Sequence, residues 1–379
     1  MEPAQGQRRG RLPGAVGPAA CPGRGAGPGG GVVIRVPAPE LADYLERLYR
    51  AAGMSRGGAR TMAAAHVEAD LRGIPGHGSR LAPPYVAKLR SGRLNPRPRV
   101  RALHDSGVCL VLDADLAPGP VAARLAVTAC VSRARRNGIG LVSVHRAGHA
   151  GALGVAASQA ATKGLVSMVA APTSSASVAL LGGTGAPVLG NSAFAVAVPG
   201  PEPDQPVVVD LAAASSSWGR VHHRARAGQD LPGGWALDAA GCPVRDPHRA
   251  AVLLPAGERG QALAIVLQLL LGALTSTCPL PVGAEGRGLL SLAVDPSRLG
   301  TNVAAAAGEI ARAVRAQGAR MPGDRAWTHR TTAQKDGIEL DDHDLATLIA
   351  AGQPDVRAPH GWSRPHPTRP VTAPMEALP

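Results

Sequence analysis

Hydrophobic residues recur at helical spacing along much of the chain. The first such segment, 39–52, is predicted to be an amphipathic helix. Its apolar face comprises Leu41, Tyr44, Leu45, Leu48 and Tyr49. The same periodicity predicts helices over 56–70, 84–91, 121–137, 152–163, 260–274 and 303–316. Gly138, Gly164 and Gly318 follow three of these segments, where glycine favours the end of a helix.

Short apolar runs between these helices predict β-strands. They lie at 108–112, 140–145, 165–171, 194–198, 207–210 and 289–294, while the Gly-rich segment 231–244 is expected to form turns. Segment 121–171 therefore alternates helix, strand, helix and strand. This order is typical of an α/β sheet.

The most apolar helix raises the question of a membrane span. Residues 262–274 are short for a span and carry Gln268 at their centre, and polar residues 275–277 follow directly. We therefore expect a helix buried in a globular core, and no membrane association.

Both ends of the chain differ in composition from its middle. Residues 1–31 are rich in Gly, Pro and Arg and residues 353–379 are Pro-rich, so we expect a disordered leader and a disordered tail. The folded part is then about 32–352. A chain of 379 residues has room for about two domains.

Composition excludes several classes of protein. Hydrophobic residues make up 45% of the chain, which excludes wholesale disorder, and aromatic residues only 2%, which disfavours stacking platforms for single-stranded nucleic acid. A net charge of +13 would suit a nucleic-acid-binding protein. However, the arginines are scattered, and a base-composition bias explains them better, so no nucleic-acid partner is expected.

Cysteine usage indicates a reducing compartment. The chain has five cysteines, an odd number without a Cys-x-x-Cys pair, and no secretory signal is present. We therefore expect a cytoplasmic protein without a disulfide framework.

Two histidines stand in glycine-flanked turns. His77 lies in Gly76-His77-Gly78 and His149 in Gly148-His149-Ala150-Gly151. An imidazole titrates near neutral pH and suits proton transfer, although a histidine in a turn can equally be a structural cap. His149 follows a predicted strand and precedes a predicted helix, a place where α/β proteins bind ligands and where helix N–H groups could hold an anion.

Other candidate motifs are weaker. His145 and His149 have metal-binding spacing on a helix, but the adjacent glycines favour a turn, so no metal is expected. The one Gly-x-Gly-x-x-Gly match lies in the low-complexity leader at 25–30, and no Walker or nucleophile-elbow motif occurs. Asp210 ends an apolar strand, where a carboxylate would bind a ligand hydroxyl or cap a turn.

Taken in order, short motifs over residues 33–350 resemble one known family. They lie at 71–78, 94–98, 138–142, 148–151, 182–183, 207–212, 231–238, 246–247, 253–255 and 321–324. Each motif alone is weak, but their order and spacing together are specific. The chain thus resembles the malate / L-sulfolactate / ureidoglycolate dehydrogenases, also called the malate/L-lactate dehydrogenase family.

The resemblance implies a non-Rossmann α/β fold with a mixed-sheet cofactor domain and a smaller helical domain made from both chain ends. On this basis the helical domain would comprise 32–115 and 289–352, and the NAD(P)-binding domain 116–288. It also implies a homodimer that acts on a small 2-hydroxy or 2-oxo acid, or a related imino acid, with NAD or NADP as cofactor.

The resemblance also implies roles for individual residues. His149 corresponds to the proton-transfer histidine, and His77 and Tyr85 to residues of the substrate pocket. Arg80 is the nearest arginine to the position that holds the substrate carboxylate. The residues that correspond to dinucleotide contacts are Thr173, Asp210, Leu211, Ala212, Arg259, Gly323 and Asp324.

Several positions depart from the family pattern. Gly76 stands where Ser is usual before the first histidine, and Leu81 stands where the carboxylate-binding Arg is usual, with Arg80 one place early. Arg259 replaces a Lys, Ser192 an Asn and Gln268 a common acid.

These departures fall on polar positions and leave three hypotheses. The first is an active oxidoreductase with His149 as the general acid/base. The second is a catalytically weakened or silent relative that keeps the dimer and the cofactor pocket. The third, a basic nucleic-acid-associated protein, rests on charge alone.

Overall fold

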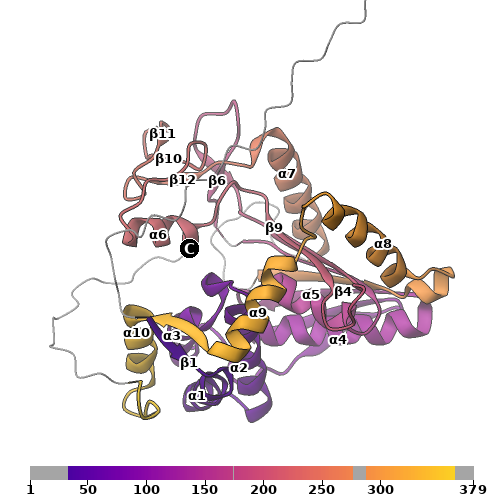
Figure 1. Cartoon of the computed structure of the whole chain (residues 1–379), viewed down its shortest axis with the longest axis horizontal. Coiled ribbons are helices and arrows are strands. Elements are labelled where there is room, and N and C mark those ends of the chain that lie inside the picture. The colour runs from indigo at the N-terminus through magenta and orange to yellow at the C-terminus, as the bar shows by residue number, and fades with distance from the viewer. Residues whose placement is uncertain (1–32, 174, 276–286, 363–379) are drawn as a thin grey trace, which may run out of the picture. The chain divides into compact units, whose positions relative to one another are not determined.

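The computed structural model describes residues 33–173, 175–275 and 287–362 (Figure 1). Within these residues the strands form one seven-stranded sheet, one five-stranded sheet and one two-stranded pair. The seven-stranded sheet, called the large sheet below, has the spatial order β2 (Arg101–Asp105), β3 (Cys109–Ala117), β4 (Ile139–Ala147), β13 (Arg287–Val294), β5 (Val166–Ala171), β8 (Ala193–Val198) and β9 (Val207–Ala212).

The large sheet is mixed, as the expected fold requires. β3 and β4 are parallel, whereas β13 runs antiparallel to both β4 and β5. The strands β3 and β13 cross the boundaries of segment 116–288, to which the sequence assigned the cofactor domain, and β2 lies before it. Strand pairing thus joins segments that are distant in sequence into one sheet.

Two alanine-rich helices cover one side of the large sheet. α4 (Gly119–Asn137) connects β3 to β4, and α5 (Leu153–Ala161) packs on β5 and β8. The core between them consists mainly of alanine and valine. Small side chains allow the helices to approach the sheet closely, which explains how a chain with few aromatic residues fills its interior.

The helical part draws on both ends of the folded chain. It contains α1 (Ala38–Ala51), α2 (Arg56–Leu71), α3 (Ala82–Arg90), α9 (Asp324–Asp336) and α10 (Asp342–Gly352). β1 (Val33–Val36) pairs with β14 (Ile338–Asp341) and so joins the two ends of this part directly. The predicted apolar face of α1 is fully buried in its core, which confirms that pattern.

The expected tail begins later than the composition indicated. Val356 and Trp362 are buried in the core of the helical part, and the Trp362 ring lies 4.9 Å from that of Tyr44. Apolar side chains thus anchor a Pro-rich segment that the sequence assigned to a disordered tail. The expected leader, residues 1–31, and the rest of the tail lie outside the described residues.

The five-stranded sheet, called the small sheet below, consists of very short strands. In spatial order these are β11 (Pro243–Val244), β10 (Ala236–Leu237), β12 (Val252–Leu253), β6 (Val178–Ala179) and β7 (Pro187–Leu189). α6 (Trp218–Arg226) packs on its core through Val221. A two-residue strand is too short to show an alternation of apolar and polar positions. The sequence therefore predicted only turns over 231–244, which is correct for most of that segment.

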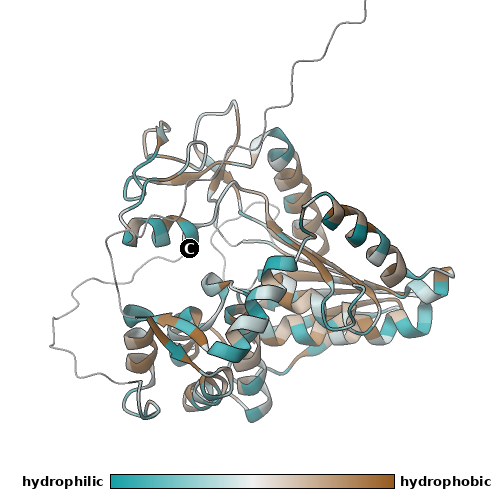
Figure 2. Cartoon of the chain, in the orientation of Figure 1, coloured by the Kyte–Doolittle hydropathy of each residue, from teal (hydrophilic) through white to brown (hydrophobic). Residues whose placement is uncertain are grey.

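The apolar helix α7 (Gly257–Leu274) is half-exposed, which contradicts the expectation of a buried helix. Leu267 and Leu271 pack beneath it, whereas a second face is exposed. This exposed face comprises Ile265, Val266, Leu269, Leu270 and Leu274. Figure 2 shows the hydrophobic colour along α7 and the neighbouring α8 (Val303–Ala316). Among the described residues, no helix has the length and apolarity needed to span a membrane.

Candidate active site

His149 lies in the turn between β4 and α5, close to the start of α4. The backbone of Gly119 approaches this turn so closely that a Cβ at this position would overlap the carbonyl oxygen of His149. Gly148 donates its N–H to Ala117 at the end of β3, at 2.9 Å. The ends of two parallel strands and one helix therefore fix the backbone of His149.

The structure brings His149 together with the two other predicted pocket residues. Tyr85, from α3, lies with its hydroxyl 3.1 Å from His149 Nδ1 and donates to the His149 carbonyl at 2.5 Å. The His77 ring, from the short helix Pro75–His77, is stacked on the His149 ring with 5.6 Å between centroids and an interplanar angle of 6°. Residues from three separate segments thus form one cluster.

Two groups of the protein contact Nδ1 of His149. They are the Gly151 N–H, at 3.3 Å, and the Tyr85 hydroxyl oxygen, at 3.1 Å. In the Nδ1–H tautomer the Tyr85 oxygen accepts from Nδ1 while its own proton goes to the His149 carbonyl, and Nε2 carries the lone pair that can accept a proton. His149 accordingly uses Nδ1 to hold its own orientation and keeps Nε2 for a ligand.

Burial and neighbouring charges keep both histidines neutral. Loss of hydration, followed by the charges of His77, Arg287, Lys88 and His66, lowers the pKa of His149 well below its usual value. Loss of hydration also lowers the pKa of His77, while the Asp210 carboxylate partly opposes this change. In the free protein the imidazole of His149 is therefore ready to accept a proton at neutral pH.

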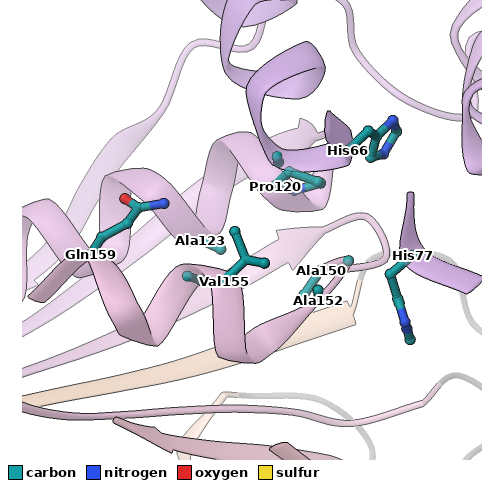
Figure 3. Close-up of a pocket in the computed structure, with 11 residues that line it drawn as sticks. His66, His77, Pro120, Ala123, Ala150, Ala152, Val155 and Gln159 are labelled. Carbon is teal, nitrogen blue, oxygen red and sulfur yellow. The ribbon is translucent and has the colours of Figure 1, made fainter. Parts of the chain in front are cut away.

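A second buried pair lies behind this cluster. The Tyr49 hydroxyl is 2.8 Å from His66 Nδ1, and the His66 ring lies 5.4 Å from that of Tyr85. Burial lowers the pKa of His66 to about 3. His66 Nε2 has no hydrogen-bond partner among the described residues. It borders a cavity of about 20 Å³ between α2, α4 and α5, which His77 also lines (Figure 3).

Asp70 holds the segment that carries His77. Its carboxylate accepts the Ser79 N–H at 2.8 Å, and a Cβ at Gly78 would overlap it. Burial raises the pKa of Asp70 to about 6, although hydrogen bonds from Ser79 oppose the change. The glycine after His77 is therefore required for close contact with Asp70.

Arg80 does not join the histidine cluster. It forms ion pairs with Asp341, at 3.1 Å, and with Asp344, both at the start of α10. The structure thus directs the arginine predicted to hold a substrate carboxylate towards two carboxylates of the protein itself. Leu81, which occupies the position usual for that arginine, carries no charge.

The predicted dinucleotide contacts are grouped around β9. The Asp210 carboxylate accepts the Gly154 N–H at 2.7 Å and so occupies the N-terminus of α5, where the sequence placed a bound anion. Loss of hydration raises the pKa of Asp210. Leu211 is 48% exposed, and Ala212 ends the strand beside it.

The other predicted contacts lie on the segments next to β9. Arg259 is exposed in the first turn of α7, whose start is hydrogen-bonded to Ala213 just after β9. Gly323, with φ of +99°, begins α9 and packs against Val208, whereas the Asp324 side chain pairs with Arg315 at 2.8 Å. Thr173 follows β5 and packs tightly against Gly190.

Two of the departures from the family pattern contact one another. Gln268 Oε1 accepts from the Ser192 hydroxyl at 3.4 Å and from the Gly190 N–H at 3.3 Å. An amide at 268 and a hydroxyl at 192 form a neutral pair. Gln268, which stands where an acid is common, therefore has a neutral hydrogen-bond partner in Ser192.

Sequence reasoning missed Tyr49, His66, Lys88 and Arg287. Tyr49 and His66 lie on buried helix faces, where a pattern of apolar positions does not distinguish them from core residues. Arg287 begins β13 and Lys88 lies on α3, and both positive charges act on His149. No motif surrounds either residue, so only the pairing of distant segments identifies them.

Comparisons with known proteins agree with this architecture. Residues 36–349 match the family model described as malate/L-lactate dehydrogenase. The chain belongs to this family. It is therefore an oxidoreductase, of a family whose members include malate, sulfolactate and ureidoglycolate dehydrogenases.

Individual relatives share about a third of the sequence. Ureidoglycolate dehydrogenase (NAD(+)) of Escherichia coli O157:H7 is 33% identical over 66% of this chain and 71% of its own. A Δ1-pyrroline-2-carboxylate/Δ1-piperideine-2-carboxylate reductase of Pseudomonas putida is 30% identical over 85% and 98% of the two chains. Among solved structures, a dehydrogenase from Sinorhizobium meliloti has a TM-score of 0.78 at 29% identity, with 84% of this chain and 98% of that chain covered.

Proposed function

We propose that this oxidoreductase transfers a hydride between NAD or NADP and a small 2-oxo or 2-hydroxy acid, or a related imino acid, with His149 as the general acid/base. The observation that carries the proposal is the cluster of Tyr85, His149 and His77, in which Nδ1 of His149 is held and Nε2 remains for the substrate. The dehydrogenases and reductases among the relatives support the reaction class.

The residues around His149 have distinct tasks. In the oxidation of a hydroxy acid, the neutral imidazole takes the hydroxyl proton as the carbon gives up hydride; in the reverse direction the imidazolium gives that proton to the oxo oxygen. The Gly151 N–H and the Tyr85 hydroxyl fix the ring, and His77 stacked on it limits access of water.

The lowered pKa of His149 sets the preferred state of the free protein. Because the imidazole is neutral at pH 7, the free protein is prepared for the oxidation of a hydroxy acid. Reduction requires the imidazolium and is therefore expected to accelerate as the pH falls. A bound carboxylate would favour the imidazolium, since an opposite charge stabilises the charged form.

The residues around β9 fit a nicotinamide dinucleotide. Leu211 is an exposed apolar side chain near the end of β9, and Arg259 is an exposed cation in the first turn of α7, whose start is hydrogen-bonded to Ala213. An apolar side chain suits a flat ring, and a cation at a helix N-terminus suits a phosphate. Gly323, with φ of +99°, adopts a backbone conformation that favours glycine where α9 meets β9. When bound, the dinucleotide would supply the hydride, and the protein would position it against the substrate carbon.

A second candidate function is that of a silent relative that keeps the cofactor pocket. The observation that favours it is the ion pairing of Arg80 with Asp341 and Asp344, together with Gly76 and Leu81 at usually polar positions. This reading predicts dinucleotide binding without turnover of any 2-oxo acid.

We further propose that the protein is a homodimer in the cytoplasm. The exposed apolar face of α7 supports a protein–protein interface, because a contiguous row of exposed apolar side chains usually marks a surface that another protein covers. The reduced cysteines Cys109, Cys130 and Cys242 among the described residues suit a reducing compartment.

The first experiment is a titration of the purified protein with NADH and NADPH, followed by cofactor fluorescence without substrate. Saturable binding supports the dinucleotide site and selects the cofactor. A panel of glyoxylate, pyruvate, 2-oxobutyrate, oxaloacetate and Δ1-pyrroline-2-carboxylate then tests turnover by loss of nicotinamide absorbance. Binding with turnover supports the enzyme, binding without turnover supports the silent relative, and a folded protein that binds neither dinucleotide contradicts both.

A further inference from the structure

A 2-oxo acid substrate, which rests on the proposed function, carries a carboxylate that needs a cation near His149. A guanidinium is the side chain that binds a carboxylate best, through two parallel hydrogen bonds. Arg80 is already paired with Asp341 and Asp344, and Leu81 is uncharged. The cation must therefore come from another segment of the chain.

Arg287 lies at the right place in the large sheet. It is the first residue of β13, and its Cα is paired with that of Ala147, the last residue of β4 and two residues before His149. The register of this pair shifts between Arg287 and Leu289, which marks a β-bulge. Bulges beside active sites commonly re-aim a side chain.

A second irregularity faces this bulge from β4. Arg146, next to Ala147, adopts φ of +54°, and its guanidinium is held by Asp113 at 2.8 Å on both nitrogens. The neighbouring arginine is thus held on β3, whereas Arg287 begins β13 opposite Ala147. The local backbone separates the two arginines.

The charge of Arg287 reaches both reactive side chains. It lowers the pKa of Tyr85 and that of His149, and at His149 it acts more strongly than Lys88. The positive charge of Arg287 thus acts on His149 and on the tyrosine that orients it. Lys88 acts on His149 but is not among the charges that act on Tyr85.

We propose that Arg287 binds the substrate carboxylate and so replaces the arginine that the chain lacks at position 81. The guanidinium at the β13 bulge would hold the acid while the adjacent carbon meets His149 Nε2. Binding then also changes the state of His149, because the carboxylate neutralises the positive charge that disfavours the imidazolium. Arg287 would thereby couple occupancy of the site to the protonation needed for reduction.

The test compares Arg287→Met, Arg287→Lys, Lys88→Met and Arg80→Met in the full chain. The substrate is the 2-oxo acid that the wild type reduces best, set against its methyl ester, which keeps the oxo group and loses the charge. For Arg287→Met we expect KM for the acid to rise roughly 30-fold or more and KM for the ester to change less than about threefold. Arg287→Lys keeps the positive charge but loses the two parallel hydrogen bonds of the guanidinium. Its KM for the acid is therefore expected to lie between those of the wild type and Arg287→Met.

Two further readouts exclude a merely structural role. The Kd for NADH should stay within about twofold of the wild-type value. The limb of the kcat/KM profile for reduction on which activity falls as the pH rises should move to higher pH in Arg287→Met, since removal of a positive charge raises the pKa of His149. If the wild type binds NADH but reduces no acid in the panel, the Kd of oxamate for the protein–NADH complex replaces KM.

The outcomes separate the two proposals. An acid-selective loss in Lys88→Met or Arg80→Met, with Arg287→Met unchanged, overturns the assignment of Arg287 and leaves the dehydrogenase intact. Equal losses for acid and ester in Arg287→Met also overturn it. A wild type that binds neither dinucleotide nor oxamate removes both proposals.

Discussion

A single side chain, His149, carries the proposed chemistry, and its properties come from its neighbours. Its Nδ1 is contacted by Gly151 and Tyr85, its ring is stacked on His77, and desolvation lowers its pKa. A histidine in solution would titrate near pH 6.5 and choose freely between tautomers. The protein has removed both freedoms.

Replacement of His149 by Ala should abolish turnover and leave the fold intact. General acid/base catalysis contributes at least about 100-fold, so kcat should fall by that factor or more, while NADH binding persists. The matched control is His145→Ala, four residues earlier on β4 and outside the histidine cluster. Equal activity in the two variants would contradict the role of His149.

His66 should make the protein less stable in acid. The pKa of His66 is about 6.5 in the unfolded chain and about 3 in the folded chain. Between these pH values the unfolded state binds more protons, so the unfolding free energy falls as the pH is lowered. From pH 7 to pH 5.5 the wild type should lose about 1 kcal/mol more unfolding free energy than His66→Phe.

This comparison is made by urea unfolding at the two pH values. The difference between the two proteins is the relevant quantity, because Asp70, with its pKa raised to about 6, contributes with the opposite sign in both. Parallel pH dependences for wild type and variant would show that folding does not lower the pKa of His66.

Among the elements, the start of α4 is the one that most directly fixes the site. Gly119, the first residue of α4, touches the backbone of His149, and Pro120 follows it in the first turn, where proline is well tolerated. The helix that covers the large sheet thus also positions the turn that carries His149. Packing and the proposed catalysis both depend on Gly119.

Gly119→Ala should therefore damage both stability and activity. The added Cβ would meet backbone atoms, which cannot rotate away, so we expect a loss of about 2 kcal/mol or more in unfolding free energy and a lower kcat in what remains folded. Gly57→Ala in the first turn of α2, where nothing lies within 4 Å, serves as control and should be neutral or slightly stabilising. Equal thermal midpoints for the two variants would contradict the close contact.

At the scale of the whole molecule, the most conspicuous feature is the exposed face of α7. Leu269 is 60% exposed and lies in line with four other apolar side chains. Leu267 and Leu271 pack one face of α7 against the large sheet, and the other face is exposed. This arrangement supports the proposed homodimer.

Leu269→Glu should shift the protein from dimer to monomer. A buried glutamate without a partner is costly at an apolar interface, so the mass in solution measured by light scattering should halve. Leu299→Glu, an exposed apolar position outside α7, is the control and should leave the mass unchanged. A dimer that survives Leu269→Glu would place the interface elsewhere.

Much of the fold could be predicted from the sequence because its helices and strands are strongly patterned. The expected ranges agree with α1, α2, α3, α4, α5, α7 and α8 to within a few residues, and the resemblance correctly indicated the family and its mixed α/β fold. The missed helices are α6, α9 and α10. The first two bury one and two residues respectively, so they carry no apolar period, and α10 buries only Leu345 and Leu348 among its large apolar residues. The strands β10 and β11 are too short to show one.

The sequence by itself determined most of the long helices and the central strands, and its family resemblance grouped His77, Tyr85 and His149 as site residues, because propensity, periodicity and motif order are local properties of the chain. Only the tertiary structure decided which of the candidates meet. It directed Arg80 to Asp341 and Asp344, gave the N-terminus of α5 to Asp210, and exposed half of α7. It also set Arg287 opposite Ala147, since the pairing of β13 with β4 joins residues that sequence alone leaves far apart.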